Sequence, residues 1–210
     1  MRDEHCHILW GVDDGSSSVE ETTEMLHAAC NVGIDYIVCT PHVRWSDFDA
    51  KKVLCHYEQF KKLANDTGIK TELGFELYFP ILLDLGIDAA KHFVRQETNE
   101  LLVEFNTGGQ CTYGWQRLFY KLQIDYGIDI TVAHPERYST VQENFDTVYK
   151  MKEIGCRIQV SAGDLFFGRF NKMSKCAKRI IKEGLCDCVV SDAHCAQDYN
   201  DFKRAQEKFR

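Results

Sequence analysis

Two histidines separated by one residue lie near the start of the chain, and further histidines and carboxylates recur along it. Imidazole nitrogens and carboxylate oxygens bind divalent metal ions, and a set without cysteine suits manganese, iron or zinc better than copper. Five of the eight histidines belong to this set, whereas the other three lie in stretches with helical periodicity. The candidate metal ligands are His5, His7, Asp14, His42, Glu76, Glu104, His134, Asp192 and His194.

Strands that alternate with helices are the elements expected to bring these residues together. Apolar runs of strand length and composition occur at 5–9, 34–40, 71–77, 101–105, 128–133, 156–160 and 187–191. Between them lie helical patterns, such as 19–32, which follows capping-box residues and ends before Gly33. This alternation predicts an α/β fold with a mainly parallel sheet, and seven repeats favour a barrel over an open sheet.

In such a barrel, functional side chains gather at the carboxyl ends of the strands, which is where the candidate ligands occur. His5 and His7 are two residues apart, so on one strand their side chains point to the same face and can hold one ion. Asp192 and His194 repeat this spacing after the last predicted strand.

Composition narrows the class of protein. With 210 residues and 44% hydrophobic content, the chain is expected to form one domain over residues 1–210. A net charge of -7 without basic runs argues against nucleic acid and anionic membranes as partners. No apolar stretch reaches the about 18 residues of a membrane span, and no signal sequence is evident. We therefore expect a cytoplasmic protein whose ten cysteines are reduced.

Five motifs resemble those of the polymerase-and-histidinol-phosphatase (PHP) superfamily, and more narrowly its bacterial protein-tyrosine phosphatases of the CpsB/YwqE type, which act in capsular polysaccharide biosynthesis. The resemblance covers nearly the whole chain, in order. It implies a distorted seven-stranded α/β barrel, up to three metal ions, often manganese or iron, and hydrolysis of phosphotyrosine. The implied substrate is the autophosphorylated tail of a bacterial tyrosine kinase that controls capsule or exopolysaccharide export. The motifs are His5–Leu9, Asp13–Gly15, Thr40–His42, Ala133–Tyr138 and Ser191–His194.

The resemblance also assigns roles to residues. It implies a metal-bound hydroxide as the nucleophile and a bridging role for Glu76 between two ions. Arg137 is expected to bind the phosphoryl oxygens in a fork, and the alternative is a structural ion pair with Glu136 or another carboxylate. The implied groups of ligands are His5, His7, Glu76 and Asp192 for one ion, Glu76, Glu104 and His134 for a second, and Asp14, His42 and His194 for a third.

The chain departs from the family's pattern at two places. Trp10 stands where the family commonly has proline, and with Trp45 it forms either an aromatic wall for a tyrosyl ring or part of the core. The family usually has an arginine about five residues after the last metal histidine, but residues 195–199 contain none and the next is Arg204. The replacement for this phosphate-binding arginine is therefore open.

Three other functions are open. Cys111 and Arg117 fit the C-x-x-G-x-x-R loop of cysteine-dependent phosphatases, although this pattern arises easily by chance and leaves the candidate ligands unexplained. A PHP-type phosphoesterase acting on a small molecule such as histidinol phosphate is a second alternative. The third is a metal-binding regulator without catalytic activity.

Overall fold

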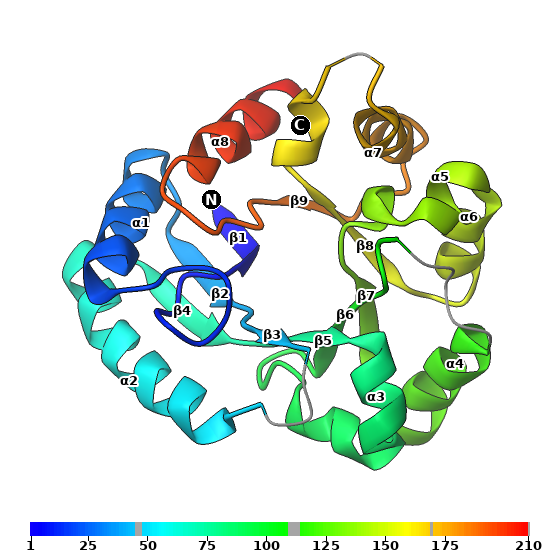
Figure 1. The fold of residues 1–210 in the computed structure, drawn as a ribbon, viewed down its shortest axis with the longest axis horizontal. Helices are drawn as coiled ribbons and strands as arrows, with labels where there is room; N and C mark the ends of the chain where they lie inside the picture. Colours follow the sequence, from blue (N-terminus) through cyan, green and yellow to red (C-terminus); the bar gives the residue numbers. More distant parts are fainter. Residues whose placement is uncertain (45–47, 109–113, 169, 210) are drawn as a thin grey trace.

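A curled parallel sheet surrounded by helices forms the core of the computed structural model, which describes residues 1–44, 48–108, 114–168 and 170–209 (Figure 1). The strands of these residues are β1 (Arg2–Cys6), β2 (Tyr36–Cys39), β3 (His42–Val43), β4 (Lys70–Leu73), β5 (Glu76–Tyr78), β6 (Glu100–Glu104), β7 (Asp129–Val132), β8 (Arg157–Ser161) and β9 (Cys188–Val190). The α-helices are α1 (Val19–Asn31), α2 (Ala50–Thr67), α3 (Phe79–Leu85), α4 (Trp115–Tyr126), α5 (Ser139–Glu143), α6 (Asp146–Glu153), α7 (Lys172–Lys182) and α8 (Asp198–Phe209). Three 3₁₀ helices complete the set: η1 (Ile87–His92), η2 (Pro135–Arg137) and η3 (Gly163–Phe166).

The strands form two sheets, β1-β2-β4 and β3-β5-β6-β7-β8-β9, in which every neighbouring pair is parallel. The ends of the curl approach each other where an isolated parallel bridge joins Cys6 to Ala193. There the His7 amide donates to the Ala193 carbonyl at 2.9 Å, and the Asp192 amide donates to the His5 carbonyl at 2.9 Å. β1 and the end of β9 therefore lie side by side, and the residues that follow these two strands meet at one site.

The predicted α/β class and parallel pairing agree with this structure, whereas the division into strands and the end of the first strand differ from the prediction. The described residues form nine strands, because β3 follows β2 as a separate strand and the segment 71–77 is divided into β4 and β5. The first strand ends at Cys6 instead of Leu9. Beyond it, the Ile8 carbonyl accepts a hydrogen bond from the Thr22 hydroxyl of α1 at 2.7 Å, so the apolar residues 8 and 9 are buried outside a ladder.

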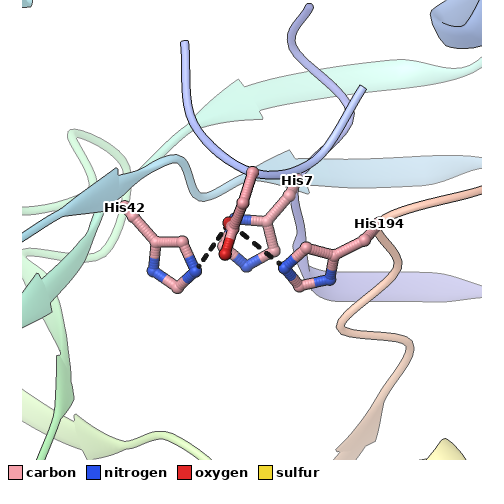
Figure 2. A group of neighbouring side chains, drawn as sticks. His7, His42 and His194 are labelled. Carbon is pink, nitrogen blue, oxygen red and sulfur yellow. Dashed lines mark ion pairs between the residues drawn. The ribbon is translucent and has the colours of Figure 1, made fainter. Parts of the chain in front are cut away.

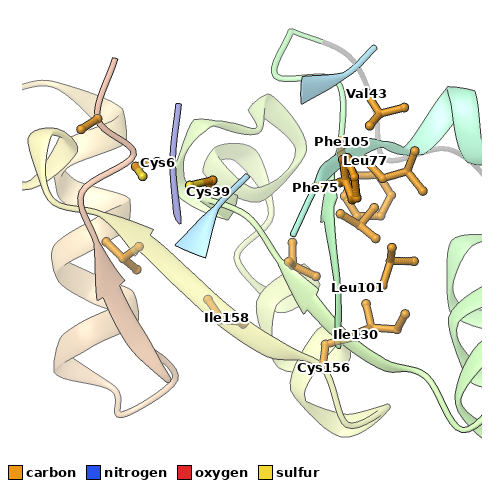
Figure 3. Packing of buried hydrophobic residues seen from close by; sticks show 14 of the residues in the cluster. Cys6, Cys39, Val43, Phe75, Leu77, Leu101, Phe105, Ile130, Cys156 and Ile158 are labelled. Atoms are coloured by element: carbon orange, nitrogen blue, oxygen red, sulfur yellow. The ribbon is translucent and has the colours of Figure 1, made fainter. Parts of the chain in front are cut away.

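Apolar side chains fill the space between the sheet and the helices (Figure 3). Phe105 packs against Phe79, Phe119 and Tyr138, with ring centroids 4.7 to 5.7 Å apart. The Tyr138 hydroxyl donates to the Ala133 carbonyl and accepts from the Phe105 amide at 3.1 Å. Since these backbone groups adjoin His134 and Glu104, the buried tyrosine fixes the spacing between two candidate ligands.

Two expectations from composition concern the whole chain. All nine cysteines in the described ranges are free thiols, and Cys111 lies outside those ranges. Across the same ranges, no helix combines the length and the hydropathy that crossing a membrane requires.

Candidate metal centre

His5 and His7 direct their Nε2 atoms at the same point, where those atoms lie 3.2 Å apart. Glu76 Oε2 lies 3.3 Å from the first of these atoms and 3.4 Å from the second. Three donor atoms with this spacing are close enough that these residues would hold one divalent ion at ordinary metal–ligand bond lengths. On the other side of the histidine pair, Asp192 Oδ1 lies 3.4 Å from His5 Nε2 and 3.3 Å from His7 Nε2.

Glu76 occupies the middle of the site and uses its two oxygens in different directions. Oε1 lies 2.8 Å from His134 Nε2, whereas Oε2 faces His5, His7 and His42 Nδ1, the last at 2.8 Å. Glu104 Oε1 is 3.9 Å from His134 Nε2. A carboxylate with this arrangement is suited to joining two adjacent ions.

A third group of potential ligands lies at the outer edge of the site (Figure 2). The rings of His7, His42 and His194 face one another, with centroids 4.2 Å apart between His7 and each of the others. Asp14 Oδ1 lies 3.2 Å from His42 Nε2 and 3.5 Å from His194 Nε2. The Asp14 side chain is 58% exposed, so this group opens towards solvent.

The structure therefore brings all nine sequence-predicted ligands together, with His42 and Glu76 at the start of the short strands β3 and β5 and the others in or after β1, β6, β7 and β9. Their donor atoms form four overlapping groups, each within 4.8 Å, that could each hold an ion. The groups differ from the expected three in that His7 joins the outer group and His42 pairs with Glu76 and Glu104. His134 and Asp192 form a group with His5, apart from the expected partners Glu104 and His7. The groups are His7, Asp14, His42 and His194; His5, His134 and Asp192; His5, His7 and Glu76; and His42, Glu76 and Glu104.

The buried carboxylates of this site are held in their charged form. Burial raises the pKa of the Glu76 carboxyl, but the charges of His5 and His42 more than reverse this, so the pKa lies well below its ordinary value. Burial likewise raises the pKa of Asp192, and the positive charges of Arg137 and His5 bring it well below the ordinary value. Negative charge enclosed by imidazoles is the environment that a divalent cation favours.

Buried polar atoms without hydrogen bonds provide a test of whether metal ions fit. In the described residues, His134 Nδ1, Glu76 Oε2 and both ring nitrogens of His42 are buried and make no hydrogen bond of acceptable geometry. Such atoms are rare in folded proteins unless an ion or water satisfies them. Glu76 Oε2 and the two His42 nitrogens face other candidate ligands, so bound divalent ions would satisfy them.

Residues behind the ligands hold the two N-terminal histidines in orientation. His7 Nδ1 contacts Asp13 Oδ2 at 2.8 Å, and His5 Nδ1 contacts Gln159 Oε1 of β8 at 3.1 Å. Burial lowers the pKa of His7, but the bond to Asp13 and two further carboxylates raise it well above its ordinary value. These contacts leave each Nε2 free to face an ion, which is the usual role of a second layer of residues around a metal.

Arg137 lies beside the centre and forms ion pairs. Its Nε contacts Asp164 Oδ2 at 2.6 Å, and its Nη2 contacts Asp192 Oδ2 at 2.7 Å and donates to Ser161 Oγ at 3.0 Å. These are the structural ion pairs of the alternative interpretation, with Asp164 and Asp192 as the carboxylates in place of Glu136. The guanidinium therefore approaches the metal ligands through Asp192.

Sequence reasoning missed Arg44, Asp13 and Gln159 as parts of the site. Arg44 contacts Glu104 and Asp14 from the end of β3. Its position two residues after His42 was the signal, because the argument that placed His5 beside His7 also applies there. Asp13 adjoins a predicted ligand, whereas nothing local in the sequence marks Gln159, whose strand β8 carries no candidate ligand.

Other predicted residues lie elsewhere or outside the described ranges. Trp10 stacks on His56 of α2, with ring centroids 4.8 Å apart. Arg204 lies on α8 with its guanidinium 4.0 Å from the centre of the Phe166 ring. Trp45 and Cys111 fall outside the described residues, and Arg117 is exposed on α4.

Comparison with known proteins shows which family this chain resembles in sequence. Residues 1–205 match the family model "Capsular polysaccharide synthesis, CpsB/CapC". CapC of Staphylococcus aureus is 34% identical over 203 residues, which cover 92% of this chain and 77% of that protein. The tyrosine-protein phosphatase YwqE of Bacillus subtilis (strain 168) is 30% identical over 205 residues, covering 95% of this chain and 80% of YwqE.

A solved structure is similar along the whole chain. It belongs to a study of YwqE from Bacillus subtilis and CpsB from Streptococcus pneumoniae, described as metal-dependent tyrosine phosphatases. The TM-score is 0.84 at 28% sequence identity, with coverage of 100% of this chain and 88% of the other. The overall fold and the order of its elements are therefore those of these proteins.

Proposed function

Because the chain belongs to the CpsB/CapC family of capsular polysaccharide synthesis, we propose that it is a metal-dependent phosphatase that hydrolyses phosphotyrosine in proteins. The observation that carries this proposal is the convergence of His5 Nε2, His7 Nε2 and Glu76 Oε2 at spacings of 3.2 to 3.4 Å. Two segments far apart in the sequence supply these atoms, and Asp192 from a third segment lies within 3.4 Å of both imidazoles, which is the arrangement that an open polynuclear metal site requires.

The proposed cofactor is a cluster of two to three divalent ions, with manganese first and iron or zinc as alternatives. When bound, the ions would supply a hydroxide nucleophile at neutral pH and positive charge to neutralise the phosphoryl oxygens. The residues proposed to hold them are His5, His7, Asp14, His42, Glu76, Glu104, His134, Asp192 and His194. Glu76, with its two oxygens facing different imidazoles, is proposed as the bridging carboxylate.

Residues of the chain would also act on the substrate and on the ligands. Arg137 is proposed to hold phosphoryl oxygens, and Asp164 and Ser161 fix the direction of its guanidinium. When the phosphoryl group is transferred to hydroxide, the tyrosine side chain leaves as a phenolate, and the phenol pKa of about 10 makes it a better leaving group than an alkoxide. The reaction therefore needs no strong general acid from the protein.

The proposed substrate is the phosphorylated tyrosine tail of a bacterial tyrosine kinase that controls capsule or exopolysaccharide synthesis, which requires a cytoplasmic location. The family's description and the names of the relatives support this substrate class. We also propose that Trp10 and Trp45 form an aromatic wall for the tyrosyl ring of the substrate.

A finer description of the fold belongs to the same proposal. Taking β2 with β3 and β4 with β5 as interrupted single strands leaves seven in sequence, and the bridge between Cys6 and Ala193 joins the first to the last. We propose that the chain is one domain built as a distorted seven-stranded barrel. The domain would extend over residues 1–210.

The test is phosphate release from a phosphotyrosyl peptide by purified protein before chelation, after chelation and after manganese is restored. We expect activity to disappear with the metal and return with manganese. A double variant, His5→Ala with His7→Ala, should lose both bound metal and activity. Retention of metal content and hydrolysis in this variant would refute the proposal.

Three further measurements distinguish this function from the alternative functions. Cys111→Ser should leave activity intact, and loss of activity in that variant with survival after chelation would favour the cysteine-dependent reaction. Faster turnover of histidinol phosphate than of the phosphotyrosyl peptide would favour a small-molecule phosphatase. Normal manganese binding without hydrolysis of any phosphoester would favour a regulator.

A further inference from the structure

A cavity of about 500 Å³ opens directly onto the outer group of candidate ligands. Asp14 and His42 form part of its wall, and Val12 and Phe48 provide apolar surface. Arg44 and Lys52 supply positive charge to the same cavity, which Asp13 and Asp49 also line. A cavity with cations, metal ligands and an apolar wall matches a phosphorylated aromatic group, which has a dianionic end and a flat apolar body.

Arg44 connects two of the ligand groups. Its Nε and Nη2 atoms donate to the two oxygens of Glu104, each at 3.2 Å, in the forked geometry typical of arginine and a carboxylate. Its Nη1 atom contacts Asp14 Oδ2 at 3.3 Å. The side chain is 33% exposed, so part of the guanidinium faces solvent in the cavity.

The partners of Arg44 distinguish it from Arg137. Both carboxylates that Arg44 contacts among the described residues are candidate metal ligands, whereas Arg137 also contacts Asp164, which is not one. Ions bound to Glu104 and Asp14 would compete with the guanidinium for the same oxygens. Metal binding would therefore free the donors of Arg44 towards the cavity and leave Arg137 anchored.

We propose that Arg44 is a substrate-binding residue that holds the phosphoryl group of the substrate in this cavity. The inference rests on the proposed phosphatase function and names a residue that recognises its substrate. It also accounts for the absence of an arginine at 195–199, because Arg204, the next one along the chain, lies against Phe166 on α8. In the absence of metal, the same side chain forms ion pairs with Glu104 and Asp14.

The test compares Arg44→Gln and Arg44→Lys with the unaltered protein in two calorimetric titrations. Manganese is titrated into chelator-stripped protein, and inorganic phosphate is titrated into manganese-loaded protein. Removing a positive charge beside cation ligands should leave manganese affinity equal or tighter. Removing a forked donor should weaken phosphate binding about ten-fold or more and raise KM for a phosphotyrosyl peptide more than it lowers kcat. Arg44→Lys should give an intermediate loss, since lysine keeps the charge and lacks the fork.

Opposite effects on cation and anion affinity separate this role from a structural one. Weaker binding of both manganese and phosphate by Arg44→Gln would mean that Arg44 only supports the fold of the site, and unchanged phosphate affinity would also overturn the inference. Arg204→Gln, on the outer helix α8, should alter neither constant, and loss of phosphate binding there would assign the role to Arg204. Absence of turnover by the unaltered protein would refute the proposed phosphatase function, whereas phosphate binding would still report on Arg44.

Discussion

Single residues behind the ligands determine whether the imidazoles face a common point. Asp13 accepts from the His42 amide at 3.0 Å with the same oxygen that contacts His7 Nδ1 at 2.8 Å. Its other oxygen accepts from the Gly15 amide at 3.0 Å. One carboxylate therefore fixes the ligand that follows β1, the start of β3 and the loop that carries Asp14.

Replacement of Asp13 by alanine tests this role. We expect manganese affinity to fall about 10- to 100-fold, which is the usual effect of removing a residue that orients a metal ligand. Titration of chelator-stripped protein with manganese measures the loss, and circular dichroism checks that the fold is retained. Glu20→Ala, an exposed carboxylate on α1, serves as the control and should bind manganese normally. Equal affinity in Asp13→Ala and the unaltered protein would show that His7 needs no such partner.

At the scale of elements, the loop between β1 and α1 passes so close to the ligands that only glycine fits at residue 15. A Cβ atom on Gly15 would lie 2.0 Å from the His7 carbonyl oxygen and 2.5 Å from its Cβ. Backbone atoms cannot yield at such distances, so the loop must move. Gly15→Ala should therefore displace Asp13 and Asp14 together and reduce metal content and Tm.

Metal analysis of the purified variant and a thermal melt measure the two effects. Gly168→Ala is the matched control, since a Cβ there meets no atom within 4 Å. We expect the control to keep both metal content and Tm. Full metal content in Gly15→Ala would mean that the loop adapts without moving the ligands.

The opposite end of the sheet is held by a charge network. Glu72 of β4 accepts hydrogen bonds from Arg95 Nη2 at 2.6 Å and from the Tyr36 hydroxyl of β2 at 2.9 Å. Burial raises the pKa of Glu72, but Arg95 and Tyr36 outweigh it, so the pKa lies below its ordinary value of 4.5. A carboxyl whose folded-state pKa is lowered stabilises the fold above the unfolded-state value, and this stabilisation disappears as pH falls through the folded-state pKa.

Glu72→Gln should therefore lower the free energy of unfolding by about 2 kcal/mol at pH 7, the typical value for hydrogen bonds to charged groups. The difference from the unaltered protein should shrink as pH falls below 4.5. Urea denaturation at pH 7 and at several lower values measures both. A difference that stays constant across this range would exclude the proposed charge contribution of Glu72.

The sequence predicted the presence of the strands better than the residues at which they begin and end. Hydrophobic periodicity indicated strands at 34–40 and 101–105, and β2 and β6 lie within or overlap those ranges, because burial on both faces demands continuous apolar runs. The end of β1 was misplaced, since Ile8 and Leu9 are apolar in a loop as well as in a strand. The Ile8 carbonyl accepts a hydrogen bond from the Thr22 hydroxyl of α1, a contact that no local pattern in the sequence reports.

The site was predictable to the extent that residue type and strand position specify it. All nine candidate ligands follow from histidines and carboxylates near strand ends, and the structure places them together. Gln159 was beyond reach because its contact with His5 joins residues 154 positions apart. Arg44 was missed because an arginine is not a metal ligand, so a pattern of histidines and carboxylates does not mark it.

For the whole molecule, the metal centre joins the two ends of the curled sheet. His5 belongs to β1 and Asp192 follows β9, and both contact the same histidine, His7. The direct backbone link between these strands is confined to the bridge at Cys6 and Ala193 and the hydrogen bonds beside it. Ions that bind the folded state alone stabilise it by mass action, and here they would also hold this closure shut.

Cys6 reports on the closure directly. Its thiol is fully buried, and burial raises its pKa well above the ordinary value, so it reacts only when β1 separates from its neighbours. Removal of metal should lower Tm and speed alkylation of Cys6 about ten-fold or more. Cys156, buried at the start of β8 and away from the closure, should change much less, whereas the exposed Cys30 should react quickly in both states. Mass spectrometry of peptides after brief alkylation measures each rate, and equal rates for Cys6 with and without manganese would mean that the closure holds without the ions.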